Sequence, residues 1–124
     1  MRTKVRETYE AMSEEWWGYE PEVAEKEEGA ANPVLLASEV KRAGIDLLPE
    51  LSELRMHHLV ACVLRGSGFP AQAVLGRERA TDIVAPAYWS WVEIAGIGVV
   101  TTSSDVDLLC DEMLRLPCEK SVSE

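Results

Sequence analysis

The chain has 124 residues, of which 47% are hydrophobic and 27% charged, so it can form one domain with a hydrophobic core and has the composition of an ordinary folded protein. Acidic residues outnumber basic ones 22 to 12, which gives a net charge of −10. Because no run of Lys or Arg is present to neutralise phosphates, direct binding to nucleic acid or to an anionic membrane is not expected.

The negative charge is concentrated at the two ends of the chain. Residues 1–30 carry nine acids and four bases, residues 103–124 carry six and two, and the residues between them carry seven and six. A solubilising surface explains such an excess, and a surface that meets a basic protein partner is the sharper alternative.

The sequence favours a single cytoplasmic domain over residues 1–124. The first ten residues include basic side chains but no apolar core of a signal peptide, and no apolar run is long enough to span a bilayer. Cys62, Cys110 and Cys118 are odd in number and widely spaced, which fits reduced thiols better than a disulfide framework.

The first predicted helix covers residues 3–17. Its apolar stripe has spacings of four, three and four, and consists of Val5, Tyr9, Met12 and Trp16. Gly18 and Pro21 end or interrupt it. Residues 18–31, rich in Glu and Ala, are predicted to be a linker or a solvated segment.

A second helix is predicted to begin at Asn32. Asn is a good N-cap residue, and Pro33 suits the first helical position because its missing N–H would have no partner there. The helix is expected to run to Ala43 with Leu36 and Val40 facing the core, and Gly44 is expected to close it.

The third predicted helix is capped by Asp46 and carries Pro49 in its first turn. Residues 59–64 are apolar on every side, so this should be the most buried helix of the fold. The Gly-Ser-Gly sequence at residues 66–68 should end it.

The segment that follows, residues 69–86, leaves strand and helix open, with a weak helical tendency from Arg77 to Val84. Residues 88–94 and 99–102 are rich in aromatic and β-branched side chains and are predicted to be strands. The Gly-Ile-Gly sequence at residues 96–98 is expected to form the turn of a hairpin between them.

A last helix is predicted near the C-terminus. Its stripe has spacings of three, four and three, and consists of Val106, Leu109, Met113 and Leu116. Ser103 or Ser104 is expected to cap it and Pro117 to stop it, with residues 118–124 as a loose tail.

The stretch from Ile94 through Thr101-Thr102 to Leu109 resembles the end of the small domain in class V pyridoxal-phosphate aminotransferases. In that family a strand leads through a Thr-rich turn into a closing helix. The position at which the family has an arginine is Glu93 here, and no lysine lies in a Schiff-base context. The resemblance therefore implies a strand followed by a helix and does not imply an enzyme.

Taken in chain order, these elements predict an α+β fold that is mostly helical. We expect four to five helices packed with a small sheet or hairpin formed by residues 87–102.

His57, His58 and Cys62 form the one local group of potential metal ligands or nucleophiles. His58 and Cys62 lie one turn apart on a helix face, but a structural zinc needs four ligands, and nothing marks an oxyanion hole. We expect no metal and no cofactor. His58 should lie at the edge of the core, His57 should lie at the surface, and Cys62 should be a small buried apolar residue.

Two aromatic clusters are the best candidates for a binding surface. Trp16 and Trp17 cannot share one face of a helix, so Trp17 and the nearby Tyr19 are candidate partner contacts. Trp89 and Trp91 share one side of a strand and are either core residues or the floor of a groove. The candidate binding residues are Trp17, Tyr19, His58, Trp89 and Trp91.

The predicted function is that of a non-catalytic protein-binding or regulatory domain. It would act through its acidic surface and an exposed aromatic patch, on a protein partner or a second copy of itself. The alternative is a small enzyme or ligand-binding protein with a pocket near His58 and the Tyr88–Trp91 cluster. An apolar patch or groove would indicate the first, and a concave pocket with convergent polar groups the second.

Overall fold

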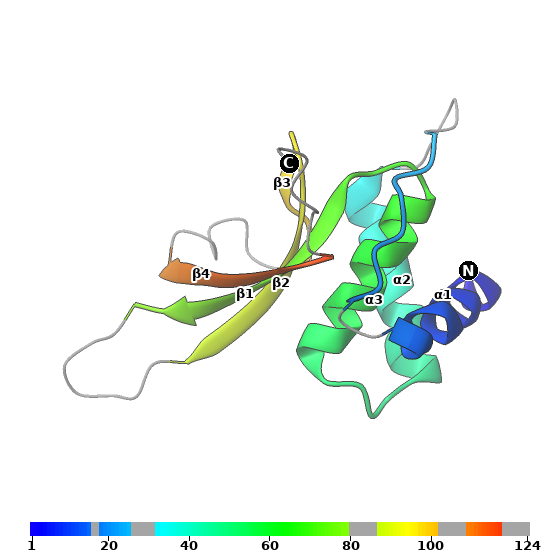
Figure 1. Ribbon diagram of the computed structural model, residues 1–124, viewed down its shortest axis with the longest axis horizontal. Coiled ribbons are helices and arrows are strands. Elements are labelled where there is room, and N and C mark those ends of the chain that lie inside the picture. Colours follow the sequence, from blue (N-terminus) through cyan, green and yellow to red (C-terminus); the bar gives the residue numbers. More distant parts are fainter. Residues whose placement is uncertain (16–17, 26–31, 80–86, 102–108, 118–124) are drawn as a thin grey trace.

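The computed structural model describes residues 1–15, 18–25, 32–79, 87–101 and 109–117. These ranges contain three helices, α1 (Arg2–Glu15), α2 (Pro33–Leu47) and α3 (Glu53–Gly66). They also contain four antiparallel strands in the order β3-β2-β1-β4: β1 (Ala71–Glu78), β2 (Tyr88–Ile94), β3 (Gly98–Val99) and β4 (Cys110–Leu116). The helices gather at one side and the sheet extends from them (Figure 1). The prediction of a mostly helical fold with four to five helices and a sheet confined to residues 87–102 is therefore wrong.

α3 is the centre of the core, as its apolar run predicted. Nine consecutive residues, Met56–Leu64, are buried. A helix buried all round needs cover on every side, and here α1 and α2 pack against it together with β1 and β2. None of the three described helices is long and apolar enough to cross a bilayer.

α1 contributes the predicted stripe to this core. Val5 and Met12 are fully buried, and Tyr9 is half-buried against the core, whereas Trp16 lies outside the described residues. An ion pair between Arg2 and Asp46 joins the beginning of α1 to the end of α2.

α2 begins where the sequence predicted and ends later. The Asn32 side chain accepts hydrogen bonds from the N–H groups of Val34 and Leu35, with Pro33 at the first helical position. Gly44 does not end the helix, which continues to Leu47. A Cβ at Gly44 would lie 2.5 Å from Sδ of Met56 on α3, so glycine leaves room there for the Met56 side chain to approach α2.

Asp46 does not cap α3, because it belongs to the last turn of α2. Proline disfavours the helical conformation in the residue before it, and Leu48, which precedes Pro49, has φ −135° and ψ 60°. The chain therefore turns at residues 48–51, and Ser52 caps α3 by accepting a hydrogen bond from the Arg55 N–H.

Residues 18–25 form neither an α-helix nor a strand but are attached to α3. The Ala24 N–H donates to the Arg65 carbonyl (2.8 Å), and Nε of Arg65 donates to the Pro21 carbonyl (2.7 Å). Figure 1 shows this segment running beside α3. The described part of the predicted linker is thus fixed to the core, and its remainder, residues 26–31, lies outside the described residues.

The ambiguous segment after α3 supplies the central strand. β1 pairs with β2 from Ala71 opposite Ile94 to Arg77 opposite Tyr88. The weak helical tendency predicted from Arg77 is wrong at Arg77 and Glu78, which end β1, and residues 80–86 lie outside the described residues.

The predicted hairpin of β2 and β3 is present. β2 has the expected bounds, and the turn uses positive φ angles at Gly96 (83°) and Gly98 (107°), which glycine adopts without strain. The second strand is shorter than predicted, because β3 ends at Val99, although the Val100 N–H still donates to the Val92 carbonyl (2.9 Å).

The predicted last helix is wrong over residues 110–116, which form β4 and pair with β1. This segment contains Leu, Met, Glu and Arg but no β-branched residue, so its propensity favours a helix. Pairing outweighs that propensity, because Leu116 enters the core opposite Ala73. Residues 102–108 and 118–124 lie outside the described residues.

The sheet has an inner face against the helices and an outer face with a small core of its own. Inner-face residues in the main core are Ala71, Ala73, Val92, Ile94 and Leu116. On the outer face, Val74, Trp91 and Cys110 are buried together. Trp91 lies over Gly76, since a Cβ at this glycine would be 2.6 Å from the Trp91 ring and 2.8 Å from Cβ of Cys110.

We therefore predict that Gly76→Ala lowers the free energy of unfolding by about 1–3 kcal/mol through overpacking against the Trp91 ring. The matched control is Gly66→Ala, because a Cβ there meets nothing within 4 Å and alanine is the better helix former. Urea denaturation measures both variants. Equal effects of the two substitutions would mean that Trp91 does not pack against Gly76.

Candidate functional site

The two aromatic clusters have different surroundings. Trp17 lies outside the described residues, and Tyr19 is half-buried against the main core. Trp89 and Trp91 share the outer face of β2, as their spacing predicted, but Trp91 is 2% exposed and Trp89 is 47% exposed. Trp91 therefore fills the outer core, whereas Trp89 remains open to solvent.

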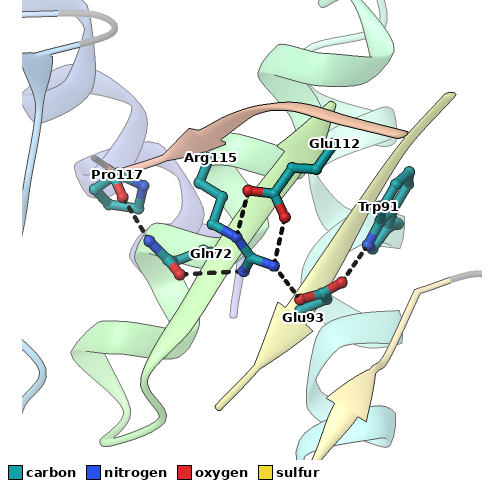
Figure 2. A network of polar contacts seen from close by, with 6 residues as sticks. All are labelled: Gln72, Trp91, Glu93, Glu112, Arg115 and Pro117. Carbon is teal, nitrogen blue, oxygen red and sulfur yellow. Dashed lines mark hydrogen bonds and ion pairs between the residues drawn. The ribbon is translucent and has the colours of Figure 1, made fainter. Parts of the chain in front are cut away.

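A polar network fixes Trp91 and spans three strands of the outer face (Figure 2). Glu93 accepts a hydrogen bond from Nε1 of Trp91 and pairs with Nη2 of Arg115, both at 2.8 Å. Arg115 also bonds to Glu112 (2.8 Å) and to Gln72 (3.3 Å). The hydrogen bond to Glu112 contributes most to raising the pKa of Arg115. The network ties β2 to β4 across β1, which is a structural role.

A second polar chain runs from α2 through the core to the sheet. The side chain of Lys41 lies 3.0 Å from Nε2 of His57, and Nδ1 of His57 lies 2.7 Å from Oγ of Ser90. His57 and Ser90 are buried, so the predicted surface position of His57 is wrong. Lys41 is half-buried at the surface of α2. Lys41 and His57 are 16 residues apart in the sequence, and His57 and Ser90 are 33 apart, so no local pattern predicted this group.

The direction of these hydrogen bonds follows from the lysine. An ammonium group can only donate, so Nε2 of His57 must accept and Nδ1 must carry the ring proton and donate to Ser90. Burial, reinforced by the charge of Lys41, lowers the pKa of His57 to about 3, so the ring is neutral near pH 7. In a serine nucleophile the histidine accepts the serine proton instead, so Ser90 is not activated in this arrangement.

Tyr19 lies close to His58 and Cys62, which are both on α3. Burial lowers the pKa of His58 to about 4, against a hydrogen bond at the Tyr19 backbone that favours the charged form. Burial raises the pKa of Cys62 to about 12 and also raises that of Tyr19. At neutral pH the thiol is protonated and therefore a poor nucleophile. The described residues contain no group of three or more His, Cys, Asp or Glu side chains that could hold a metal.

The inner face of the sheet is covered only in part. The paired ends of β1 and β2 extend beyond the helices (Figure 1). Going outward along β1, Ala73 is buried, Leu75 is half-buried and Arg77 is exposed. Tyr88 opposite Arg77 is exposed, as is Leu114 opposite Leu75.

Large apolar side chains gather at this uncovered end, which we call the sheet-end patch. It consists of Leu75, Tyr88 and Leu114, which the strand register places on the inner face, together with the exposed Leu109 and Met113 at the same end of β4. The sequence prediction missed it, because Leu109 and Met113 were assigned to the buried stripe of a helix. The apolar positions 110, 113, 114 and 116 do not alternate, so no strand pattern marked this segment in the sequence.

The two buried histidines predict a pH dependence of stability. Both folded pKa values lie below the ordinary value near 6.5, so the unfolded chain binds more protons and stability falls as the pH decreases from 6.5 towards 4. Between pH 7 and 4 the free energy of unfolding of His57→Gln should fall by roughly 3 kcal/mol less than that of the wild type. Urea denaturation between pH 7 and 4 measures it, and the same slope in both proteins would contradict the neutral buried His57.

Comparison of the chain with protein-family models, with curated proteins and with solved structures finds no significant match. The function is therefore argued from the geometry of the described residues.

Proposed function

We propose that the protein is a non-catalytic binding domain whose sheet-end patch receives a protein partner. The observation that carries this proposal is the group of large apolar side chains, all but Leu75 exposed, where the sheet extends beyond its helices. Exposed apolar clusters of this kind commonly mark interaction sites, because their burial removes apolar surface from water at about 25 cal/mol per Å².

The composition of the patch also suits a partner. Tyr88 offers a large amphipathic ring, and tyrosine is enriched at the energetic centres of interfaces. Met113 is an adaptable apolar side chain of the kind that promiscuous binding surfaces favour. Trp89 lies one residue further along β2 on the outer face, where its Nε1 donates to Glu78 (3.1 Å) and half of its surface remains exposed.

Side-chain packing is a better binding mode here than the addition of a strand. In the described part of the chain β4 is the edge strand nearest the patch, and β3 is the opposite edge, so the outer backbone groups of β4 could pair with another strand. A bulge between Leu75 and Gly76 interrupts the register of β4, however, and Asp111 and Glu112 place charges on the edge. These features oppose edge pairing in natural sheets.

The acidic surface gives the proposed partner a charge. Glu7, Glu10, Glu14 and Glu15 are exposed on α1 or at its end, within a chain of net charge −10. Such a field attracts a basic partner and accelerates encounter, whereas the apolar patch supplies the affinity. We also propose a cytoplasmic location, because reduced thiols are typical of that compartment. Cys62 and Cys110 are free and buried, which supports it.

The alternative of a pocket built by His58 and the Tyr88–Trp91 cluster is less favoured. His58 is buried on α3, and Trp91 fills the outer face of the sheet, on the side away from the helices. His58 and Trp91 thus lie on opposite sides of the sheet and do not line one pocket. Ser90 and Cys62 are also not activated for nucleophilic catalysis, because Ser90 accepts a hydrogen bond from His57 and the Cys62 thiol is protonated.

We predict that Tyr88→Ser weakens partner binding or self-association by about 2 kcal/mol or more, roughly 30-fold, because a central aromatic contact is lost. Leu35→Ser is the matched control, since Leu35 on α2 is as exposed as Tyr88, at 64% against 59%. The free energy of unfolding of both variants should lie within about 0.5 kcal/mol of the wild-type value.

Quantitative capture from an extract of the source cells, together with analytical ultracentrifugation of the purified chain, compares the three proteins. The proposal fails if Tyr88→Ser and Leu35→Ser reduce binding equally. It also fails if the wild type neither captures a protein nor associates with itself.

A further inference from the structure

A groove of about 550 Å³ lies between α2 and the strand end that follows β3. It is separate from the sheet-end patch. Val34 and Ile45 on α2 and Val100 on the sheet side give it apolar walls, and Lys41 lies on the α2 side of the groove between them. Its volume falls in the range of small-molecule sites.

Lys41 is held in place by the polar chain to the core. Its ammonium donates to Nε2 of His57 (3.0 Å), and His57 is fixed in turn by Ser90 (2.7 Å). Burying a polar side chain costs free energy unless it is hydrogen-bonded, and both His57 and Ser90 are hydrogen-bonded here. One of the three ammonium N–H groups is used, so Lys41 retains donors for a ligand and loses less side-chain freedom on binding one.

Other donors line the same groove. Oγ1 of Thr101 accepts a hydrogen bond from the Val92 N–H (2.9 Å), which leaves the hydroxyl proton of Thr101 to donate elsewhere. Ser38 adds a second hydroxyl and Arg42 a second cation. The polar side chains of the groove in the described part of the chain are thus two hydroxyls and two cations, with no carboxylate among them, although the chain has a net charge of −10.

We propose that this helix–hairpin groove binds a small organic carboxylate. Its carboxylate would accept hydrogen bonds from Lys41 and Thr101, and its apolar body would lie on Val34, Ile45 and Val100. A carboxylate fits better than inorganic phosphate, because the groove offers apolar walls that a bare anion would leave exposed to water.

A titration with sodium octanoate followed by ¹H–¹⁵N NMR tests the proposal on the whole chain. We expect saturable shifts of the Lys41, Val100 and Thr101 amides, and a shift of the His57 ring nitrogens as the ammonium moves towards the carboxylate. Lys41→Met should weaken octanoate binding at least about tenfold, the size of one charge-assisted contact. Lys4→Met, an exposed lysine on α1, should leave it unchanged.

A second variant guards against loss of fold in Lys41→Met. Ile45 is exposed at the groove wall, so Ile45→Asp should preserve the melting temperature while it repels the carboxylate, again with at least about tenfold weaker binding. The proposal is overturned if octanoate causes no saturable shifts, or if 1-octanol or inorganic phosphate binds as tightly as octanoate. It is also overturned if both Lys41→Met, when folded, and Ile45→Asp bind octanoate like the wild type.

Discussion

The burial of α3 on all sides is the constraint on which the rest of the fold depends. A helix with nine consecutive buried residues needs α1 and α2 on one side and the sheet on the other. This arrangement explains Gly44, which lets Met56 approach α2. It also explains why His57, which is carried into the core by the same helix, is neutral and bonded to Lys41 and Ser90 on the elements that cover α3.

One end of the sheet extends beyond the helices that cover the other end, and this uncovered end forms the proposed binding surface (Figure 1). Near α3 the inner face is buried, and further along the strands the same face carries the exposed side chains of Tyr88 on β2 and Leu114 on β4. The projecting half is stabilised from the outer face instead. There Trp91 packs over Gly76, whereas the ion pair between Arg115 of β4 and Glu93 of β2 ties the strands together nearer the helices. A small outer core thus lets the sheet extend without helices and leaves the sheet-end patch free to meet a partner.

Local patterns predicted the local features, and features set by distant contacts escaped them. The Asn32 cap, the buried run of α3 and the glycine turn after β2 depend on neighbouring residues, and the sequence showed them. β4 was predicted as a helix because its propensity is helical and its pairing with β1 is non-local. The unequal exposure of Trp89 and Trp91 is set by Gly76 on another strand, which the spacing along β2 cannot reveal. The Lys41–His57–Ser90 chain was invisible for the same reason.

The central claim is that a helix buried on all sides supports the fold, while the far end of the sheet lies outside the helical layer. Native-state hydrogen exchange at residue resolution tests this claim most directly. The amides of residues 59–64 in α3 should exchange only through global unfolding, with the denaturant dependence of the whole domain. Amides at the far ends of β1 and β2 should exchange through smaller openings of lower free energy. Equal or greater protection at the far end of the sheet, or exchange of α3 through local opening, would contradict the account.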